Sequence, residues 1–200
     1  VFHMIDEGID TGAIIYNKRS LFPASCKVPS DYETHRNKNF PNFYKGFISN
    51  LTTGHKFKLI HQIDYLGSYN PRLNTIKNGL IDWNFSSRDL YNFINAFDDP
   101  YPGASTFLDR GNFGKLHLKK VHLHAGDGSN HSFMSGIVSR HDKDWIVVST
   151  TDKYMLLIES IINQKGENII SKIRPGDRFY TPVEKLSAAK SSRVTYTSKG

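Results

Sequence analysis

Apolar residues between positions 40 and 51 recur at helical spacing. They stand at the i, i+3, i+4 and i+7 positions that place side chains on one face of a helix. The stripe consists of Phe40, Phe43, Tyr44, Phe47, Ile48 and Leu51. The pattern predicts an amphipathic helix from about Phe40 to Leu51, which ends near Thr53 and Gly54.

A second helix is predicted from Ser86 to Phe97, where both the apolar stripe and the start signal are clear. Ser86 is followed three residues later by Asp89, which resembles a capping box with Asp in place of the usual Glu. The apolar stripe of this helix is Leu90, Phe93, Ile94 and Phe97. Pro100 follows soon after and disfavours helical geometry in the residue before it, so the helix ends there.

The remaining patterns are typical of strands. Residues 1–20 read as strand, acidic loop and strand, with apolar residues at 1–5 and 13–16. After Gly103 short β-prone runs are separated by Gly, Asp and Asn. These runs are residues 116–121, 136–138, 145–149 and 154–159. The last two flank residues 150–153, which we interpret as the turn of a hairpin.

These patterns predict an α/β region that passes into a small β-rich subdomain, with a boundary between residues 107 and 108. With 200 residues, of which 38% are hydrophobic and 22% charged, the chain can bury a sizeable core. No stretch approaches the roughly 18 consecutive apolar residues of a membrane span, so no membrane association is expected. A single cysteine, Cys26, excludes an internal disulfide framework and favours a reducing compartment such as the cytoplasm.

The positive charge is concentrated near the C-terminus. The net charge is +7, and residues 172–200 carry seven basic residues and two acids, a net charge of +5. Such a basic tail can meet an anionic partner such as tRNA or a nucleotide. A solvated, partly flexible terminus explains the same composition, and both interpretations stay open.

Two candidate sites are weak on the residues alone. Asp10-Thr11-Gly12 matches the tripeptide of aspartic proteases, but it follows a charged loop and the chain has no second copy to share a proton with. Five histidines lie close in sequence, at positions 117, 122, 124, 131 and 141. His122 and His124 would share one strand face, yet no thiol or carboxylate cluster accompanies them, so we expect no metal site.

Three stretches, in order, carry a resemblance to a known family. The first is residues 2–15, a strand with a His, an acidic loop, an Asp-x-Gly and an apolar strand. The second is Ile-Asp-Trp at 81–83, and the third is Pro-Tyr-Pro-Gly-Ala at 100–104. Together they resemble the 10-formyltetrahydrofolate-dependent formyltransferases over most of residues 1–160. The segments at 69–74 and 97–99 look more like the branch that formylates amino groups on nucleotide-linked sugars than like the methionyl-tRNA branch.

The resemblance implies a fold, a reaction and partners. Residues 1–107 are expected to be the C-terminal part of a Rossmann-like formyltransferase core, and residues 108–200 a β-rich subdomain with a basic tail. The implied co-substrate is 10-formyltetrahydrofolate, without a metal, and the acceptor is a nucleotide-linked amino sugar for glycan biosynthesis. Methionyl-tRNA formylation, with tRNA as partner, and a non-catalytic formyltransferase-like interaction module are the alternatives. A homodimer also stays open.

The family's chemistry uses an Asn, a His and an Asp around a tetrahedral intermediate, which needs oxyanion stabilisation and proton removal. Asp10 matches the family's Asp and is the predicted catalytic residue. The loop before it matches the segment that wraps the pteridine ring, so we predict folate binding by Met4, Ile5, Asp6, Glu7, Gly8 and Ile9. Gly8 suits a bent loop because glycine tolerates positive φ, and His3 is either a plain strand residue or a supporting one.

For the acceptor we predict Tyr69 and Arg72, because an aromatic face can stack on a base and a guanidinium can clamp a diphosphate. A polar loop explains these two residues equally well, and Trp83 and Phe97 are expected in the core. The family's Asn-x-His motif lies upstream of the Asp, and no such motif precedes Asp10. The chain is therefore expected to be the C-terminal part of an enzyme and to be inactive alone.

Overall fold

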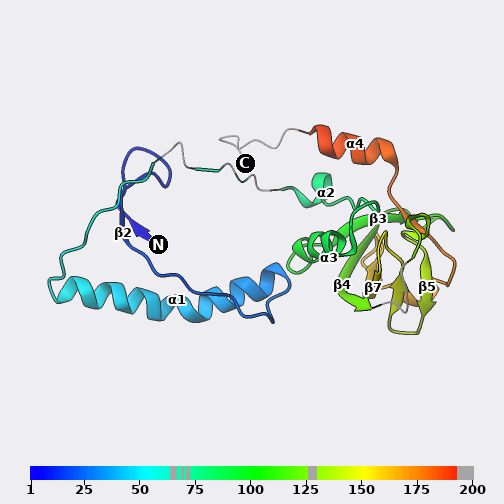
Figure 1. Ribbon diagram of the computed structural model, residues 1–200, viewed down its shortest axis with the longest axis horizontal. Helices are drawn as coiled ribbons and strands as arrows, with labels where there is room; N and C mark the ends of the chain where they lie inside the picture. Colours follow the sequence, from blue (N-terminus) through cyan, green and yellow to red (C-terminus); the bar gives the residue numbers. More distant parts are fainter. Residues whose placement is uncertain (64–66, 69, 71–72, 126–129, 193–200) are drawn as a thin grey trace. The chain divides into compact units, whose positions relative to one another are not determined.

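The computed structural model describes residues 1–63, 67–68, 70, 73–125 and 130–192, and its two compact units are described in turn (Figure 1). The first unit comprises Val1–Lys27 and Asp31–Asn70. The second comprises Val28–Ser30 and Pro71–Gly200. The chain is divided into these two units by its internal contacts. This division does not test the domain boundary predicted between residues 107 and 108, which stays a prediction.

The first unit is built from a two-stranded antiparallel hairpin and one long helix. Strands β1 (Phe2–His3) and β2 (Ile14–Tyr16) form the hairpin, and α1 spans Pro29–Thr52. The ring of Phe2 stacks on those of Phe43 and Phe47 in α1, with centroid distances of 5.0 and 4.3 Å. Stacked aromatic rings thus join the hairpin to the helix.

This first unit has little buried core of its own. Among its described residues Cys26 is the one buried hydrophobic side chain, while many large apolar side chains are exposed. The exposed set on α1 includes Phe40, Tyr44, Ile48 and Leu51, which form one stripe along the helix. Exposed apolar stripes of this kind mark surfaces on which other protein packs.

The second unit contains a six-stranded antiparallel sheet with the strand order β5-β6-β7-β4-β3-β8. The strands are β3 (Ala104–Leu108), β4 (Leu116–Ala125), β5 (Val138–His141), β6 (Ile146–Val148), β7 (Tyr154–Ile162) and β8 (Phe179–Tyr180). Short 3₁₀ helices occur at Ser132–Met134 and Ile170–Lys172. The long β4–β7 pair runs from His117 opposite Ile162 to Ala125 opposite Tyr154 and forms the centre of the sheet.

The two edges of this sheet meet. Ile137 forms an antiparallel bridge with Arg178, and the N–H of Phe179 donates to the carbonyl of Gly136 at 2.8 Å. Gly136 has a φ of 81°, and a Cβ there would lie 2.2 Å from the Phe179 carbonyl oxygen. Glycine therefore permits the close approach by which the sheet curls and joins its edges, so that neither edge is left unpaired at this point.

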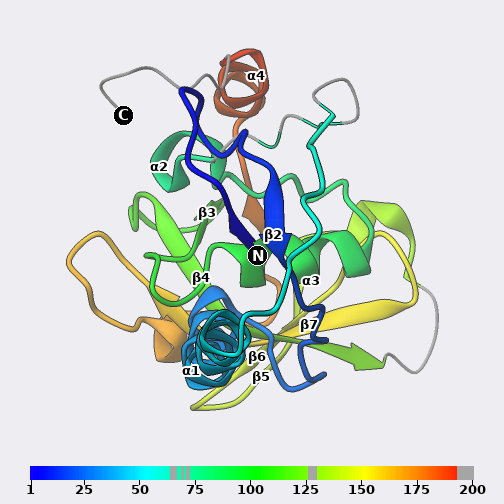
Figure 2. The ribbon, with the colours of Figure 1, turned by 90° about the vertical axis from the view of Figure 1, so that its left-hand side faces the viewer.

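Helix α3 (Ser87–Ala96) covers the sheet through contacts with β4 and β7 (Figure 1). Its side chains Leu90 and Ile94 are completely buried. The core they join consists mainly of Ile81, Trp83, Phe97, Leu116, Leu118, Ile146, Leu156, Ile158, Ile161, Ile173 and Phe179. Two further helices, α2 (Thr75–Asn78) and α4 (Val183–Ser191), have no buried residues and lie outside this core (Figure 2).

The structure confirms most of the predicted elements. The helix predicted at 86–97 is α3, and the Ser86 hydroxyl accepts the N–H of Asp89 at 3.1 Å as a capping residue does. The hairpin around residues 150–153 is the β6–β7 connection. The helix predicted from Phe40 was too short, because α1 begins at Pro29 with a polar segment that lacks an apolar stripe. Trp83 and Phe97 lie in the core as expected.

The observed architecture is thus mixed α/β with a curled antiparallel sheet. Within the described ranges the strands pair antiparallel, and the parallel sheet of a Rossmann-like core is not among them. No helix in the part of the chain that the structure describes is long and apolar enough to cross a membrane.

Candidate functional site

The stretch that carries the predicted catalytic carboxylate is the loop of the β1–β2 hairpin. The N–H of Met4 donates to the carbonyl of Ala13 at 2.9 Å, which continues the strand pairing into the loop. A Cβ on Gly12 would lie 1.8 Å from the carbonyl oxygen of Met4. Only glycine fits at position 12, so the glycine of Asp-Thr-Gly serves the close approach of two backbone segments.

Asp6 organises the interior of this loop. Its carboxylate accepts the N–H of Gly8 at 3.1 Å and the hydroxyl of Thr11. Such bonds between a side chain and nearby backbone are typical of Asp in tight turns. A Cβ on Gly8 would meet the Thr11 hydroxyl oxygen at 2.2 Å. The prediction that Gly8 supplies a positive φ is wrong, since Gly8 is needed for space and the positive φ lies elsewhere in the loop.

Asp10 adopts the left-handed conformation, with a φ of 60°. Asp is among the few non-glycine residues that tolerate this conformation, at a cost of about 1–2 kcal/mol that the surroundings must offset. The side-chain amide of Gln62 donates to the carbonyls of both Asp10 and Gly12, each at 2.7 Å. Next to it, Ile14 and Ile60 pair through two backbone hydrogen bonds of 2.8 and 3.0 Å. The segment around Gln62 therefore fixes the backbone on both sides of Thr11.

The side chain of Asp10 meets His3 on the adjacent strand. The distance from Nε2 of His3 to Oδ1 of Asp10 is 3.4 Å, and the Asp10 side chain is 86% exposed. The other ring nitrogen, Nδ1, lies 3.0 Å from the carbonyl oxygen of Met4. Both contacts are hydrogen-bonding contacts only when both ring nitrogens carry a proton. The hairpin thus presents a carboxylate and an imidazole together, with the carboxylate open to solvent.

The six predicted folate-binding residues all belong to this loop. Ile5 and Ile9 are 95% and 94% exposed, and Met4 is about half exposed. Asp6 and Gly8 bond within the loop, as described above, and Glu7 is exposed between them. The predicted acceptor residues, Tyr69 and Arg72, lie outside the described residues.

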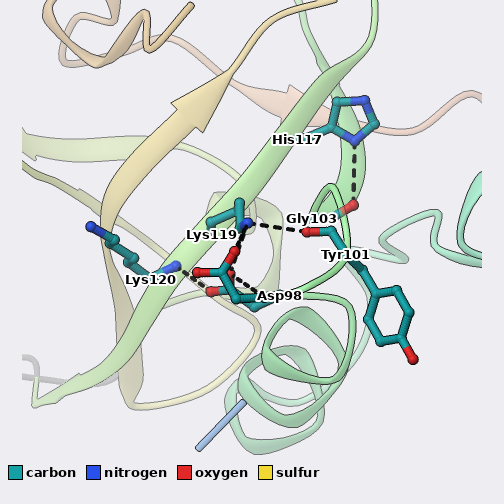
Figure 3. Close-up of polar contacts among 7 residues, drawn as sticks. Asp98, Tyr101, Gly103, His117, Lys119 and Lys120 are labelled. Atoms are coloured by element: carbon teal, nitrogen blue, oxygen red, sulfur yellow. Dashed lines mark hydrogen bonds and ion pairs between the residues drawn. The ribbon is translucent and has the colours of Figure 1, made fainter. Parts of the chain in front are cut away.

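The third stretch on which the resemblance rests, around Pro100–Ala104, is fixed by an ion cluster around the buried Asp98 (Figure 3). The carboxylate of Asp98 is 2% exposed and accepts the backbone N–H of Lys120 at 2.7 Å. Nζ of Lys119 lies 3.4 Å from Asp98, pairs with Asp99 and donates to the carbonyl of Tyr101 at 3.1 Å. Because its protons are used in these contacts, Lys119 is a structural clamp for the loop.

His117 supports the other end of the same loop. Its Nδ1 lies 3.3 Å from the carbonyl oxygen of Gly103 and 3.2 Å from the hydroxyl of Ser105 (Figure 3). Burial lowers the pKa of His117 below its usual range, and the charges of Lys115 and Lys119 act in the same direction against the Gly103 hydrogen bond. Burial therefore favours the neutral form of His117, whose ring holds the loop, and the phenol of Tyr101 points away from it.

The histidines considered as metal ligands have other neighbours. Nε2 of His122 lies 3.6 Å from Glu159, and Nε2 of His124 faces the guanidinium of Arg140. No group of three or more His, Cys, Asp or Glu side chains in the described ranges is arranged to hold a metal ion.

Two residues that build these sites were missed by the sequence analysis. Gln62 is 52 positions from Asp10, and Lys119 is 20 positions from Asp99. No local motif marks either residue, because a single polar side chain in a loop or strand has no periodic partner. The contacts of Gln62 and Lys119 are visible only in the folded structure, where each side chain meets a loop that is distant in sequence.

Comparison with known proteins agrees with the resemblance seen in the sequence. Residues 75–173 match the family model of the formyl transferase C-terminal domain. The chain is 28% identical over 116 residues to the methionyl-tRNA formyltransferase of Mycoplasma mycoides subsp. mycoides SC, a match that covers 58% of this chain and 34% of that protein. It is 30% identical over 116 residues to the bifunctional polymyxin resistance protein ArnA of Wigglesworthia glossinidia brevipalpis, covering 53% of this chain and 16% of that protein.

The chain thus spans about a third or less of the length of these relatives. The matched segment includes α3, the Pro100–Ala104 loop and the curled sheet up to the end of the second 3₁₀ helix. Residues 75–173 thus carry the formyl transferase C-terminal domain, and the chain is similar to the C-terminal part of a formyltransferase.

Proposed function

We propose that this protein is an N-formyltransferase that transfers a formyl group from 10-formyltetrahydrofolate to the amino group of a nucleotide-linked amino sugar. The match of residues 75–173 to the formyl transferase C-terminal domain supports the reaction class. The observation that carries the proposal is the Asp10 carboxylate, which is exposed beside an imidazole while Gln62 fixes its backbone. A catalytic carboxylate needs this combination of an accessible group and a fixed position.

The loop that precedes Asp10 fits a folate. Ile5 and Ile9 expose nearly their whole side chains on a loop whose backbone is bonded at Asp6, Gly8 and Gly12. Exposed apolar side chains on a fixed loop favour a planar, partly apolar ligand that covers them. When bound, the co-substrate supplies the electrophilic formyl carbon.

Two residues of this chain have proposed roles in the reaction, Asp10 in proton transfer and His3 in positioning the Asp10 carboxylate. Asp10 accepts a proton or stabilises a protonated imidazole near the attacking amine, as general base chemistry requires. His3 is a positioning residue that keeps the Asp10 carboxylate above the hairpin. The family's Asn and catalytic His are not assigned to residues of this chain.

The nucleotide-sugar acceptor rests on the segments at 69–74 and 97–99, with Tyr69 and Arg72 as its proposed contacts. A role in glycan biosynthesis and a cytoplasmic location form part of the same proposal, and the single cysteine supports a reducing compartment. A homodimer is compatible with these assignments.

A second candidate is formylation of methionyl-tRNA, which the name of the Mycoplasma mycoides relative favours. Binding of tRNA releases many counterions and falls steeply with salt, whereas one nucleotide sugar responds less. Measuring acceptor affinity at two salt concentrations separates these substrates. A third candidate, a non-catalytic interaction module, predicts that a folate analogue does not bind.

The loop assignment can be tested by calorimetry with 5-formyltetrahydrofolate, a stable analogue of the co-substrate. We expect Gln62→Ala to weaken binding about tenfold, because the loop must then be ordered on binding. Asp10→Asn should leave the affinity within about twofold, since it keeps the shape and the backbone contacts. Asp144→Asn, at an exposed turn of the second unit, is the matched control and should change nothing.

Turnover separates catalysis from binding. In the whole protein that carries this sequence, Asp10→Asn should lower kcat by about a hundredfold or more. Formyl transfer to an amino sugar by the 200-residue chain alone would contradict the expectation that this chain is inactive by itself. Unchanged kcat in Asp10→Asn would remove Asp10 from the mechanism.

A further inference from the structure

A groove of about 300 Å³ lies in the second unit between α2, α4 and the start of β4. Its lining consists of Ile76, Lys77, Leu80, Lys115, Lys185, Ala188, Ala189 and Ser192. The α4 residues recur at i, i+3, i+4 and i+7, so one face of that helix forms a wall. Both helices are labelled in Figures 1 and 2.

Three lysines from three different parts of the second unit line this groove. Lys77 belongs to α2, Lys115 precedes β4 and Lys185 belongs to the first turn of α4. Within the described ranges none of the three forms an ion pair with a carboxylate. Three like charges without a counter-charge repel one another, and a bound anion relieves that repulsion.

Lys115 is the least exposed of the three, being half-buried, whereas Lys77 and Lys185 are exposed. Its charge also reaches into the fold, since it contributes to lowering the pKa of His117. The ammonium of Lys185 lies 5.7 Å from the ring centroid of Phe107 in β3, a cation–π contact. Lys115 and Lys185 are thus partly positioned before any ligand arrives.

The floor of the groove is apolar. Leu80 and Ala189 are half-buried in it, and Ile76 is 72% exposed at its edge. An exposed isoleucine beside three ammonium groups suits a ligand that has both an anionic and an apolar or planar part. Small inorganic anions alone would leave this floor uncovered.

Specific contacts hold the α4 wall in place. The ammonium of Lys190 pairs with the carboxylate of Asp82 at 2.8 Å, and the Thr181 hydroxyl donates to the carbonyl of Ile81 at 2.6 Å. Both partners belong to the segment that leads from α2 into the core, and Ile81 is completely buried. The groove is therefore built between two elements fixed to the same core segment.

We propose that this groove binds a nucleoside diphosphate, with the diphosphate among Lys77, Lys115 and Lys185 and the base on Ile76, Leu80 and the two alanines. Three ammonium groups match the two to three negative charges of a diphosphate. The volume of about 300 Å³ is at the lower end for small-molecule sites, which suits one nucleotide. The proposal uses residues 76–192 alone, so the binding test is separate from the formyl-transfer tests.

The test is calorimetric titration of the 200-residue chain with ADP, with inorganic pyrophosphate and with adenosine. We expect ADP to bind more tightly than pyrophosphate, and adenosine to bind least. Lys115→Gln and Lys185→Gln should each weaken ADP binding about tenfold, the effect of removing one charge-assisted hydrogen bond. Lys143→Gln, at an exposed turn, is the control for overall charge and should leave the affinity unchanged.

A second pair of variants does not remove any lysine. Ala188→Glu places a carboxylate in the groove as an internal competitor and should weaken ADP binding at least about tenfold. Ser187→Glu makes the same charge change on the same helix outside the groove and should alter affinity less than about twofold. In wild type, amide resonances of Leu80, Ala188 and Ala189 should shift on addition of ADP.

Three results would overturn the proposal. The first is equal ADP affinity in wild type, Lys115→Gln and Ala188→Glu. The second is no heat and no resonance shift with ADP at millimolar concentration. The third is a single-stranded oligonucleotide that binds this face more tightly than ADP and with a steeper salt dependence, which would make the groove a nucleic-acid surface.

Discussion

Arg110 donates to both carboxylate oxygens of Asp177, from Nε to Oδ1 at 2.5 Å and from Nη2 to Oδ2 at 2.7 Å. The Asp177 side chain is 6% exposed, and it also accepts the N–H of Arg174 at 2.8 Å. Through its own carbonyl Asp177 accepts the N–H of Val138 at 2.8 Å. One residue therefore links the bidentate ion pair to the place where the sheet joins its edges.

Asp177→Asn should destabilise the second unit by about 2 kcal/mol, the usual size of a lost charge-assisted hydrogen bond. The amide keeps the shape but cannot accept from both guanidinium nitrogens. Urea unfolding followed by circular dichroism measures the change. Asp144→Asn, in an exposed pair with a distance of 3.8 Å, is the control and should change stability by less than about 0.5 kcal/mol.

The same pair makes stability depend on pH. The Arg110 hydrogen bond holds the pKa of Asp177 below its usual range, and the pKa values of Asp82 and Asp152 are also lowered against the opposing effect of burial. A lowered carboxyl pKa contributes stability that is complete above the unfolded value of about 3.9 and is lost as pH falls through the folded value. We expect unfolding free energy to fall below pH 4, and less steeply in Asp177→Asn.

The Asp98 cluster gives a contrast between a buried and an exposed acid that share one lysine. Asp98→Asn should lower the free energy of unfolding by about 3 kcal/mol. The substitution removes a carboxylate that is 2% exposed, so Lys119 and the N–H of Lys120 lose their charged partner. Asp99→Asn should cost less than about 1 kcal/mol, since Asp99 is 57% exposed. Hydrogen exchange at residues 98–103 and urea unfolding check both variants. Equal costs would mean that the loop does not depend on the buried pair.

His117 predicts a pH effect nearer to neutrality. Its pKa is lowered by burial, so the folded chain binds its proton less readily than the unfolded chain. The contribution of His117 to the free energy of unfolding is then fully present above the unfolded pKa of about 6.5, and it is lost as the pH falls through the folded pKa. His117→Asn keeps a donor for the Gly103 carbonyl and should flatten the pH dependence of urea unfolding between pH 7 and 5. An unchanged slope would show that the other histidines produce it.

Much of the second unit could be predicted from sequence because its signals are local. The capping Ser86 and the stripe that contains Leu90 and Ile94 act within a few residues, so α3 was predicted almost to its ends. Strands β3 and β8 were missed. β8 is two residues long, and its Phe179 pairs with Leu108 of the neighbouring strand β3, 71 positions away in the sequence, so no local pattern reports it.

The hairpin site could be predicted in part. Asp10 and the acidic loop stand out in the sequence, and the motif places His3 on the adjoining strand. The φ of 60° at Asp10 and the two bonds from Gln62 depend on a segment 50 to 52 positions away. The requirement for glycine at position 12 likewise follows from the carbonyl of Met4 on the opposite strand. Such contacts follow from the tertiary fold.

A last prediction concerns the hydroxyl of Thr106, which is fully buried between two partners. It accepts the indole N–H of Trp83 at 2.9 Å and donates to the carbonyl of Tyr180 at 2.9 Å. Thr106→Val keeps the volume but leaves both groups unpaired, so we expect a loss of about 2 kcal/mol.

Thr106→Ser is the matched variant, because it keeps the hydroxyl and removes one methyl group, at a cost of about 1 kcal/mol. Urea unfolding measured by tryptophan fluorescence should therefore rank wild type above Ser and Ser above Val. The rings of Trp83 and Phe179 stack with a centroid distance of 5.8 Å. If the Thr106→Val variant proved as stable as Thr106→Ser, this packing alone would hold Trp83 in place. The expected order instead makes the two hydrogen bonds at Thr106 necessary, because a buried donor and acceptor without partners cost more than a lost methyl group.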